Sequence, residues 1–102
     1  MAVLYVTEFA NLATSPNGLQ SVAAQPPLQE QTVAIGSGSL SPALTFHPAT
    51  GIVRLHTDAV CSIEIGLAPV ATSTTARMAA NQTEYFGVLK GQGWTVAVIT
   101  NS

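Results

Sequence analysis

His56 and Asp58 are the side chains in this sequence best spaced to do chemistry together. Two positions apart on an extended strand, they share a face and could ligate a metal or hydrogen-bond each other. A zinc site needs at least a third ligand, and the other histidine, His47, stands beside Pro48 in an expected loop. We therefore interpret the pair as part of a solvent-facing polar strand face and predict no metal site.

The residue types used for nucleophilic or acid–base catalysis do not form a recognisable pattern. Ser62 could nominally complete a triad with His56 and Asp58, but the Gly-x-Ser-x-Gly elbow is missing. The five carboxylates are spread along the chain and form no local pair. Cys61 is the only cysteine, which excludes an intrachain disulfide and a cysteine-based zinc site. We predict a non-enzymatic protein without a cofactor.

Three aromatic residues near the end of the chain allow two interpretations. Tyr85, Phe86 and Trp94 could form an aromatic binding platform. Aromatic residues in nearly continuous apolar strands more often belong to a core. We favour the core.

The charge content is the unusual bulk property. The 102 residues suit a single domain, 1–102, with one hydrophobic core, and 47% are hydrophobic. Only 8% are charged, against about 25% in ordinary soluble domains. A neutral polar surface is easily desolvated against a partner, which favours permanent assembly. The alternative is a domain of an extracellular or crowded setting that tolerates such a surface.

The few charges also bear on partners and location. Three cations in a chain of net charge −2 form no basic stripe, so we expect no nucleic-acid binding. Residues 1–9 contain no Lys or Arg, and Glu8 interrupts their apolar run. We therefore expect neither a signal peptide nor a membrane span, and synthesis in the cytoplasm without export.

Short apolar runs separated by turn residues predict an all-β fold, an antiparallel β-sandwich of about eight strands. No apolar pattern of helical period persists for ten or more residues. Turn residues at 15–18, 25–27, 36–39 and 90–93 separate the runs. The expected strands are Ala2–Glu8, Leu19–Ala24, Gln31–Ile35, Ala43–Phe46, Gly51–Thr57, Cys61–Ile65, Glu84–Leu89 and Trp94–Thr100.

Two hairpins are expected. In residues 51–66 apolar and polar side chains alternate on both sides of residues 58–60, and a hairpin there would place Leu55 opposite Ile63 and Arg54 opposite Glu64. Residues 84–100 are almost continuously apolar around a turn with Gly91 and Gly93. Such strands are covered on both faces, by loops or by a neighbouring subunit.

Two segments are candidates for contact with a partner. The connection 67–80 is long for a compact domain, so it is either a binding loop or a solvated surface loop. Residues 1–9 could add a strand to a neighbour or form an edge strand of the domain's own sheet.

The second half of the chain resembles a known group of proteins. The resemblance lies in residues 53–66 (VRLHTDAVCSIEIG), 69–72 (PVAT), 77–88 (RMAANQTEYFGV) and 96–99 (VAVI), about half of the chain. These segments resemble small β-sandwich, jelly-roll-like proteins encoded among the head genes of tailed bacteriophages, some of which are cement or decoration proteins of the capsid.

The resemblance implies a structural virion protein on the capsid surface that contacts the major capsid protein and itself, with a homotrimer as a natural geometry. The alternatives are another virion component, such as a head–tail connector, tail or fibre protein, or a β-sandwich that binds carbohydrate or a receptor on a host surface. We expect the following residues at an interface: Leu4, Tyr5, Phe9, Val70, Arg77, Met78, Tyr85 and Phe86.

Overall fold

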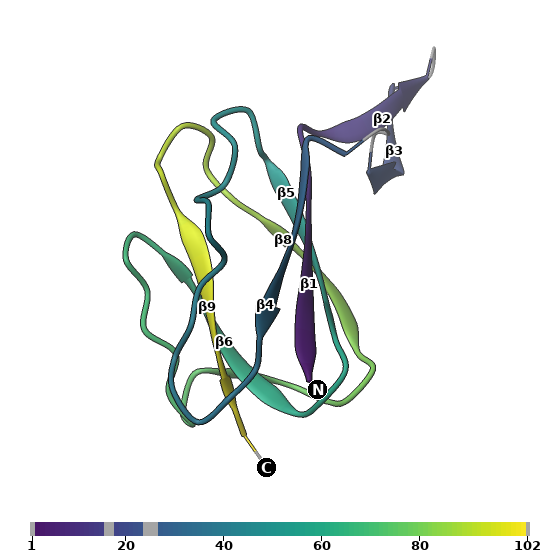
Figure 1. Cartoon of the computed structure of the whole chain (residues 1–102). Helices are drawn as coiled ribbons and strands as arrows, with labels where there is room; N and C mark the ends of the chain where they lie inside the picture. Colours follow the sequence, from purple (N-terminus) through teal and green to yellow (C-terminus); the bar gives the residue numbers. More distant parts are fainter. Residues whose placement is uncertain (1, 16–17, 24–26, 102) are drawn as a thin grey trace.

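The chain folds as an antiparallel β protein (Figure 1). The structure, a computed structural model, describes the backbone of residues 2–15, 18–23 and 27–101 and the side chains of 2–11 and 27–101. Within these ranges the chain contains strands, turns and loops but no helix, which confirms the predicted all-β class. The strands are β1 (Val3–Phe9), β2 (Leu12–Ser15), β3 (Gly18–Ala23), β4 (Gln29–Ala34), β5 (Ile52–Thr57), β6 (Cys61–Gly66), β7 (Ala76–Met78), β8 (Thr83–Gly87) and β9 (Thr95–Thr100).

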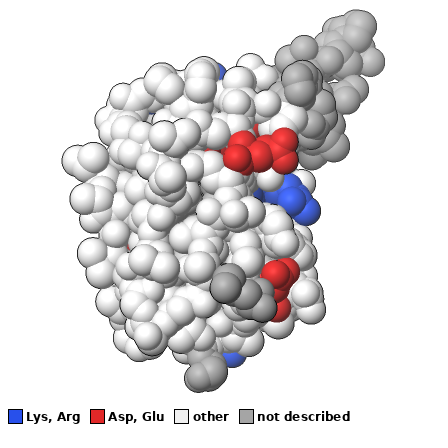
Figure 2. Space-filling view, in the orientation of Figure 1, with Lys and Arg blue, Asp and Glu red and all other residues white. Residues whose placement is uncertain are grey.

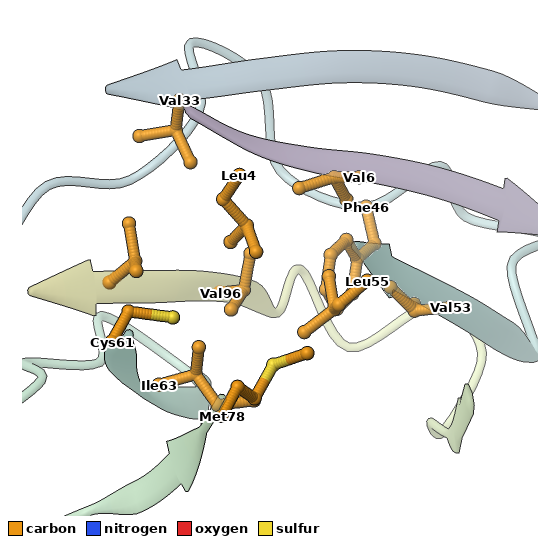
Figure 3. Packing of buried hydrophobic residues seen from close by; sticks show 11 residues of the cluster. Leu4, Val6, Val33, Phe46, Val53, Leu55, Cys61, Ile63, Met78 and Val96 are labelled. Atoms are coloured by element: carbon orange, nitrogen blue, oxygen red, sulfur yellow. The ribbon is translucent and has the colours of Figure 1, made fainter. Parts of the chain in front are cut away.

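Seven of these strands form two sheets that enclose one core. The first sheet has the order β4-β1-β5-β8 and the second the order β7-β6-β9. Alternate side chains of each strand point between the sheets, where apolar residues of both layers meet (Figure 3). The buried core cluster consists of Leu4, Val6, Val33, Phe46, Val53, Leu55, Cys61, Ile63, Met78, Val96 and Val98.

The strand pairs are nested around the β6–β7 connection. β6 pairs with β7 in the second sheet, and β5 pairs with β8 in the first. The next pair outward is an isolated bridge between Leu40 and Val98 of β9, in the second sheet again. Successive pairs therefore lie alternately in the second and the first sheet. This is the topology of a jelly roll, in which one long hairpin is folded over to form both sheets.

β2 and β3 form a separate two-stranded arm between β1 and β4. β1 and β4 pair with Glu8 opposite Gln29, so the arm is a long insertion in the turn of this hairpin. Figure 1 shows the arm standing away from the sandwich. The expected strand 19–24 corresponds to β3, whereas the expected turns at 15–18 and 25–27 fall mostly outside the described residues.

The hairpin predicted for residues 51–66 is wrong. β5 and β6 lie in different sheets, and residues 58–60 carry the chain from one to the other. Arg54 lies between Thr7 and Tyr85, while Glu64 pairs with Ala97. The alternation that suggested one buried face is real, but two strands on opposite sides of one core show the same alternation as a hairpin.

The predicted C-terminal hairpin is also wrong, because β8 belongs to the first sheet and β9 to the second. Gly91 and Gly93 have φ angles of 71° and 69°, as their turn positions required, but their loop crosses between layers. β9 is buried on both faces as expected. A loop of the chain itself covers the second sheet: the side-chain amide of Asn101 donates to Ser62 Oγ (2.6 Å) and to the Ser73 carbonyl (3.2 Å).

Three smaller expectations are corrected. Residues 43–46 form a bend at 43–44 and irregular chain at 45–46 instead of a strand, and β7 lies inside the segment expected to be a loop, 67–80. β1 is a central strand paired on both sides, so it is neither an edge strand nor free to join a neighbouring sheet. β8 is mostly exposed instead of being covered on both faces, because it forms an edge of the first sheet.

Candidate binding face

Two rows of polar and aromatic side chains cross the outer face of the first sheet. The strand registers align them across all four strands. We call these eight residues the polar face. One row is Thr32, Tyr5, His56 and Thr83, and the other is Glu30, Thr7, Arg54 and Tyr85.

The alternation of the strands produces this face. Leu4 and Val6 of β1 are fully buried, so the residues between and beside them, such as Tyr5 and Thr7, point away from the core. β5 follows the same rule, with Val53 buried in the core next to the outward Arg54. The sequence thus places apolar residues on one side of the sheet and hydrogen-bonding residues on the other.

The first row is held by contacts among its own members. The Tyr5 and His56 rings lie 6.1 Å apart between centroids, tilted by 45°. His56 Nδ1 lies 2.7 Å from Thr83 Oγ1, a hydrogen bond that fixes the imidazole. Tyr5 is nevertheless 42% exposed and Tyr85 58% exposed, so both tyrosines offer ring surface to a ligand.

An open pocket of about 430 Å³ lies at the β4 side of the polar face. Its wall consists of four residues of the polar face, Tyr5, Thr7, Glu30 and Thr32, together with Val6, Gln31 and Ala43. The Gln31 side chain is itself fixed by a reciprocal pair of hydrogen bonds with the backbone of Leu44 (2.9 and 3.0 Å).

The charges of the polar face balance. Glu30 and Arg54 lie on either side of Thr7, one strand away in each direction. Charge is sparse on the surface that Figure 2 shows, where a few small blue and red areas lie on a mostly white molecule. A ligand of strong net charge would therefore find little complementary charge here.

Glu8, near the end of β1, is buried and accepts hydrogen bonds from three surrounding groups. Its Oε1 accepts hydrogen bonds from the His47 backbone N–H (2.7 Å) and from Thr50 Oγ1 (2.8 Å). Its Oε2 accepts one from Gln29 Nε2 (2.7 Å). Because both oxygens are engaged, the carboxylate ties β1 to β4 and to the loop before β5. The period of β1 places Glu8 on the core face with Leu4 and Val6, a signal that sequence reasoning overlooked.

The residues considered for catalysis are not brought together. Ser62 is buried in the second sheet and accepts a hydrogen bond from Asn101. His56 lies on the first sheet and bonds Thr83, and Asp58 is exposed in the crossing that follows β5. In residues 2–11 and 27–101, His, Cys, Asp and Glu side chains form no group of three that could hold a metal ion.

The residues expected at an interface divide into three groups by burial. Leu4, Phe9 and Met78 are buried inside the protein, since β1 is central and β7 contributes to the core. Phe86, like Trp94, is partly buried and packs against the core cluster, as the core interpretation expected. For Tyr85 that interpretation is wrong, because its side chain points outward from the edge strand β8 and is 58% exposed. Exposed positions are held by Tyr5, Val70, Arg77 and Tyr85.

Fold and surface together define a small two-layer antiparallel β-sandwich with a polar and aromatic outer face. Comparisons of the chain with protein-family models, with curated protein sequences and with solved structures find no match. Among the described residues, no helix has the length and hydropathy needed to cross a membrane.

Proposed function

We propose that the protein is a structural subunit that stabilises the head of a tailed bacteriophage, as a cement protein bound to the capsid shell. Its contacts are made with the major capsid protein and with other copies of itself, and a trimer on a three-fold position suits this task. The support is a surface that favours assembly, together with the resemblance of the strand–loop–strand segments in residues 53–99.

The observation that carries the proposal is a set of exposed aliphatic side chains beside the second sheet. Leu40, Leu67 and Val70 are 48%, 74% and 65% exposed, and we call them the loop patch. A hydrogen bond from the Ala71 N–H to Ser39 Oγ (2.9 Å) joins the two segments that carry Leu40 and Val70. Apolar side chains within a neutral polar surround are typical of the centre of a protein–protein interface.

The β2–β3 arm supports the same function. Residues 9–29 contain no charged residue, so the whole insertion between Glu8 and Glu30 is neutral. An isolated two-stranded ladder is only marginally stable in water. Contact with a neighbouring subunit would stabilise it, and an arm that reaches beyond the sandwich is suited to bridging subunits.

The test is co-sedimentation of the purified chain with capsids of the phage that encodes it, followed by thermal disruption of the capsids. We expect the chain to bind and to raise the disruption temperature. Val70→Asp should abolish both effects because it places a charge in the loop patch. Leu89→Asp is the matched control, since Leu89 is 64% exposed on another loop and should retain both.

Three results would contradict the proposal: a gene outside any phage genome, wild-type chain that stays in the supernatant, or equal behaviour of the two variants. Light scattering tests the trimer separately. A stable monomer of the isolated chain at micromolar concentration would count against that part.

A further inference from the structure

We propose that the polar face of the first sheet is a binding site for a neutral oligosaccharide. This site lies on the sheet opposite to the loop patch, so it is independent of the proposed contact with a capsid. Contact through the second sheet would leave the polar face accessible.

The side chains of the polar face match the chemistry of a sugar. Tyr5 and Tyr85 expose aromatic rings on which the apolar C–H side of a pyranose can stack. Each of the other six positions carries a hydroxyl, imidazole, carboxylate or guanidinium that can hydrogen-bond to sugar hydroxyls. A few convergent polar groups around an apolar contact surface are typical of small-molecule sites.

Other classes of ligand fit less well. The centre of a protein interface is a closely packed apolar surface in which aromatic residues, Met and Arg are enriched. The polar face has two tyrosines and Arg54, but its other five positions carry Thr, His and Glu, so it lacks the apolar surround of such a centre. Nucleic acid requires several phosphate-binding cations, and Arg54 is the only Lys or Arg in the two rows. The single carboxylate, Glu30, balances Arg54, which favours a ligand without net charge.

The spacing of the tyrosines indicates a ligand of more than one ring. Tyr5 and Tyr85 are two strands apart and offset by two residues, because Tyr5 aligns with Thr83 through His56. With strands about 4.8 Å apart and a rise of about 3.4 Å per residue, their Cα atoms are separated by about 12 Å. A sugar ring in the pocket beside Tyr5 and a second ring on Tyr85 would be joined across Arg54 and His56.

The side chains of the polar face hold one another in place. Tyr5 contacts His56, and His56 is held by Thr83, so these side chains lose little freedom when a ligand binds. The backbone beneath them belongs to paired strands of the first sheet. Recognition of a weakly bound sugar benefits from such a rigid surface.

The experiment is an NMR titration of the ¹⁵N-labelled full chain with four neutral sugars, maltohexaose, cellohexaose, mannohexaose and hexa-N-acetylchitohexaose, and with a hexagalacturonate as the anionic probe. We expect saturable shifts of the Tyr5, His56 and Tyr85 amides with at least one neutral sugar, at an affinity of about 1 mM or better. Tyr85→Ala should weaken binding about tenfold, a loss of about 1.4 kcal/mol for one stacking contact.

Two further variants keep the test decisive. Tyr5→Phe retains the ring and should bind within about twofold of the wild type, whereas Tyr5→Ala should lose binding while its spectrum shows a folded protein. Leu89→Ala, outside the polar face, should change nothing. The proposal is overturned if no neutral probe shifts these amides at about 10 mM, if only the anionic probe binds, or if the shifts map to the loop patch.

Discussion

Glu8 illustrates how one buried side chain can hold several segments of a chain in place. A carboxylate in the interior is tolerated only when hydrogen bonds compensate for the lost water, and Glu8 receives them from one backbone amide and two side chains. These donors come from β4 and from the loop that leads to β5. Glu8 therefore acts as a shared acceptor that fixes three segments of chain relative to one another.

We expect Glu8→Gln to lower the free energy of unfolding by about 2 kcal/mol. The glutamine side chain has one oxygen in place of two, so its NH₂ group faces a donor whose hydrogen bond the second carboxylate oxygen had accepted. The change is measured by urea denaturation. Glu64→Gln is the control, because Glu64 is exposed, and it should change the stability by less than about 0.5 kcal/mol. Equal effects of the two substitutions would refute the role of the Glu8 cluster.

Cys61 gives a prediction about pH. Burial raises the pKa of its thiol above the ordinary value of 9.0, and the hydrogen bond with Thr57 lowers it in part. The unfolded chain therefore releases this proton at a lower pH than the folded protein does. The contribution of Cys61 to stability is complete below pH 9.0 and is lost as the pH rises through the folded pKa.

Urea denaturation of the wild type and of Cys61→Ala over this alkaline range provides the measurement. The wild type should lose stability more steeply than the variant, whatever the difference in their stability at neutral pH. Parallel curves would show that ionisation of Cys61 is not linked to unfolding.

At the scale of single residues the sequence supports much of the inside–outside assignment. Alternation correctly places Val53 and Leu55 inside and Arg54 and His56 outside. The polar face itself was not predicted, because it is formed by strands whose pairing the sequence does not state. Tyr5 and His56 are far apart in the chain and become neighbours only through the β1–β5 register.

At the scale of elements, the crossings were the hardest feature to predict. A short link between two amphipathic strands fits either a hairpin or a passage between layers, since both place apolar residues on one core. β5 instead finds its partners in β1 and β8, and β6 finds its partners in β7 and β9. The missed strand β7 is only three residues long, and its apolar content is too small to stand out.

The β2–β3 arm should be removable without loss of the sandwich. Glu8 and Gln29 are already opposite one another, so a short Asn-Gly type turn in place of residues 11–26 can close the β1–β4 hairpin. We expect the shortened chain to retain its β-sheet circular dichroism, with a change in unfolding free energy of at most about 1 kcal/mol. Under the proposed function it should bind capsids more weakly.

The unfolding free energy of the arm-deleted chain is compared with that of a chain in which five glycines replace residues 58–60. That link crosses between the sheets, so its alteration should destabilise the protein more than removal of the arm. Unfolding of the arm-deleted chain at room temperature would show that the arm is part of the folding unit.

At the scale of the whole molecule, the composition anticipated a neutral surface but not its division into two kinds. The all-β class, the single core and the two layers follow from the pattern of short apolar runs. The sandwich then places hydrogen-bonding side chains on the outside of one sheet and aliphatic loop residues beside the other. The proposed capsid contact and the proposed sugar site therefore lie on different surfaces of the sandwich.

The central position of β1 also determines when the first sheet can form during synthesis. β1 leaves the ribosome before both of the strands that flank it, and its partnership with β5 closes a loop of more than forty residues. Such non-local pairing slows folding to milliseconds or longer. Leu4 and Val6, which are fully buried in the folded protein, therefore stay uncovered until most of the chain has been translated. During that interval the apolar side of β1 is open to premature association.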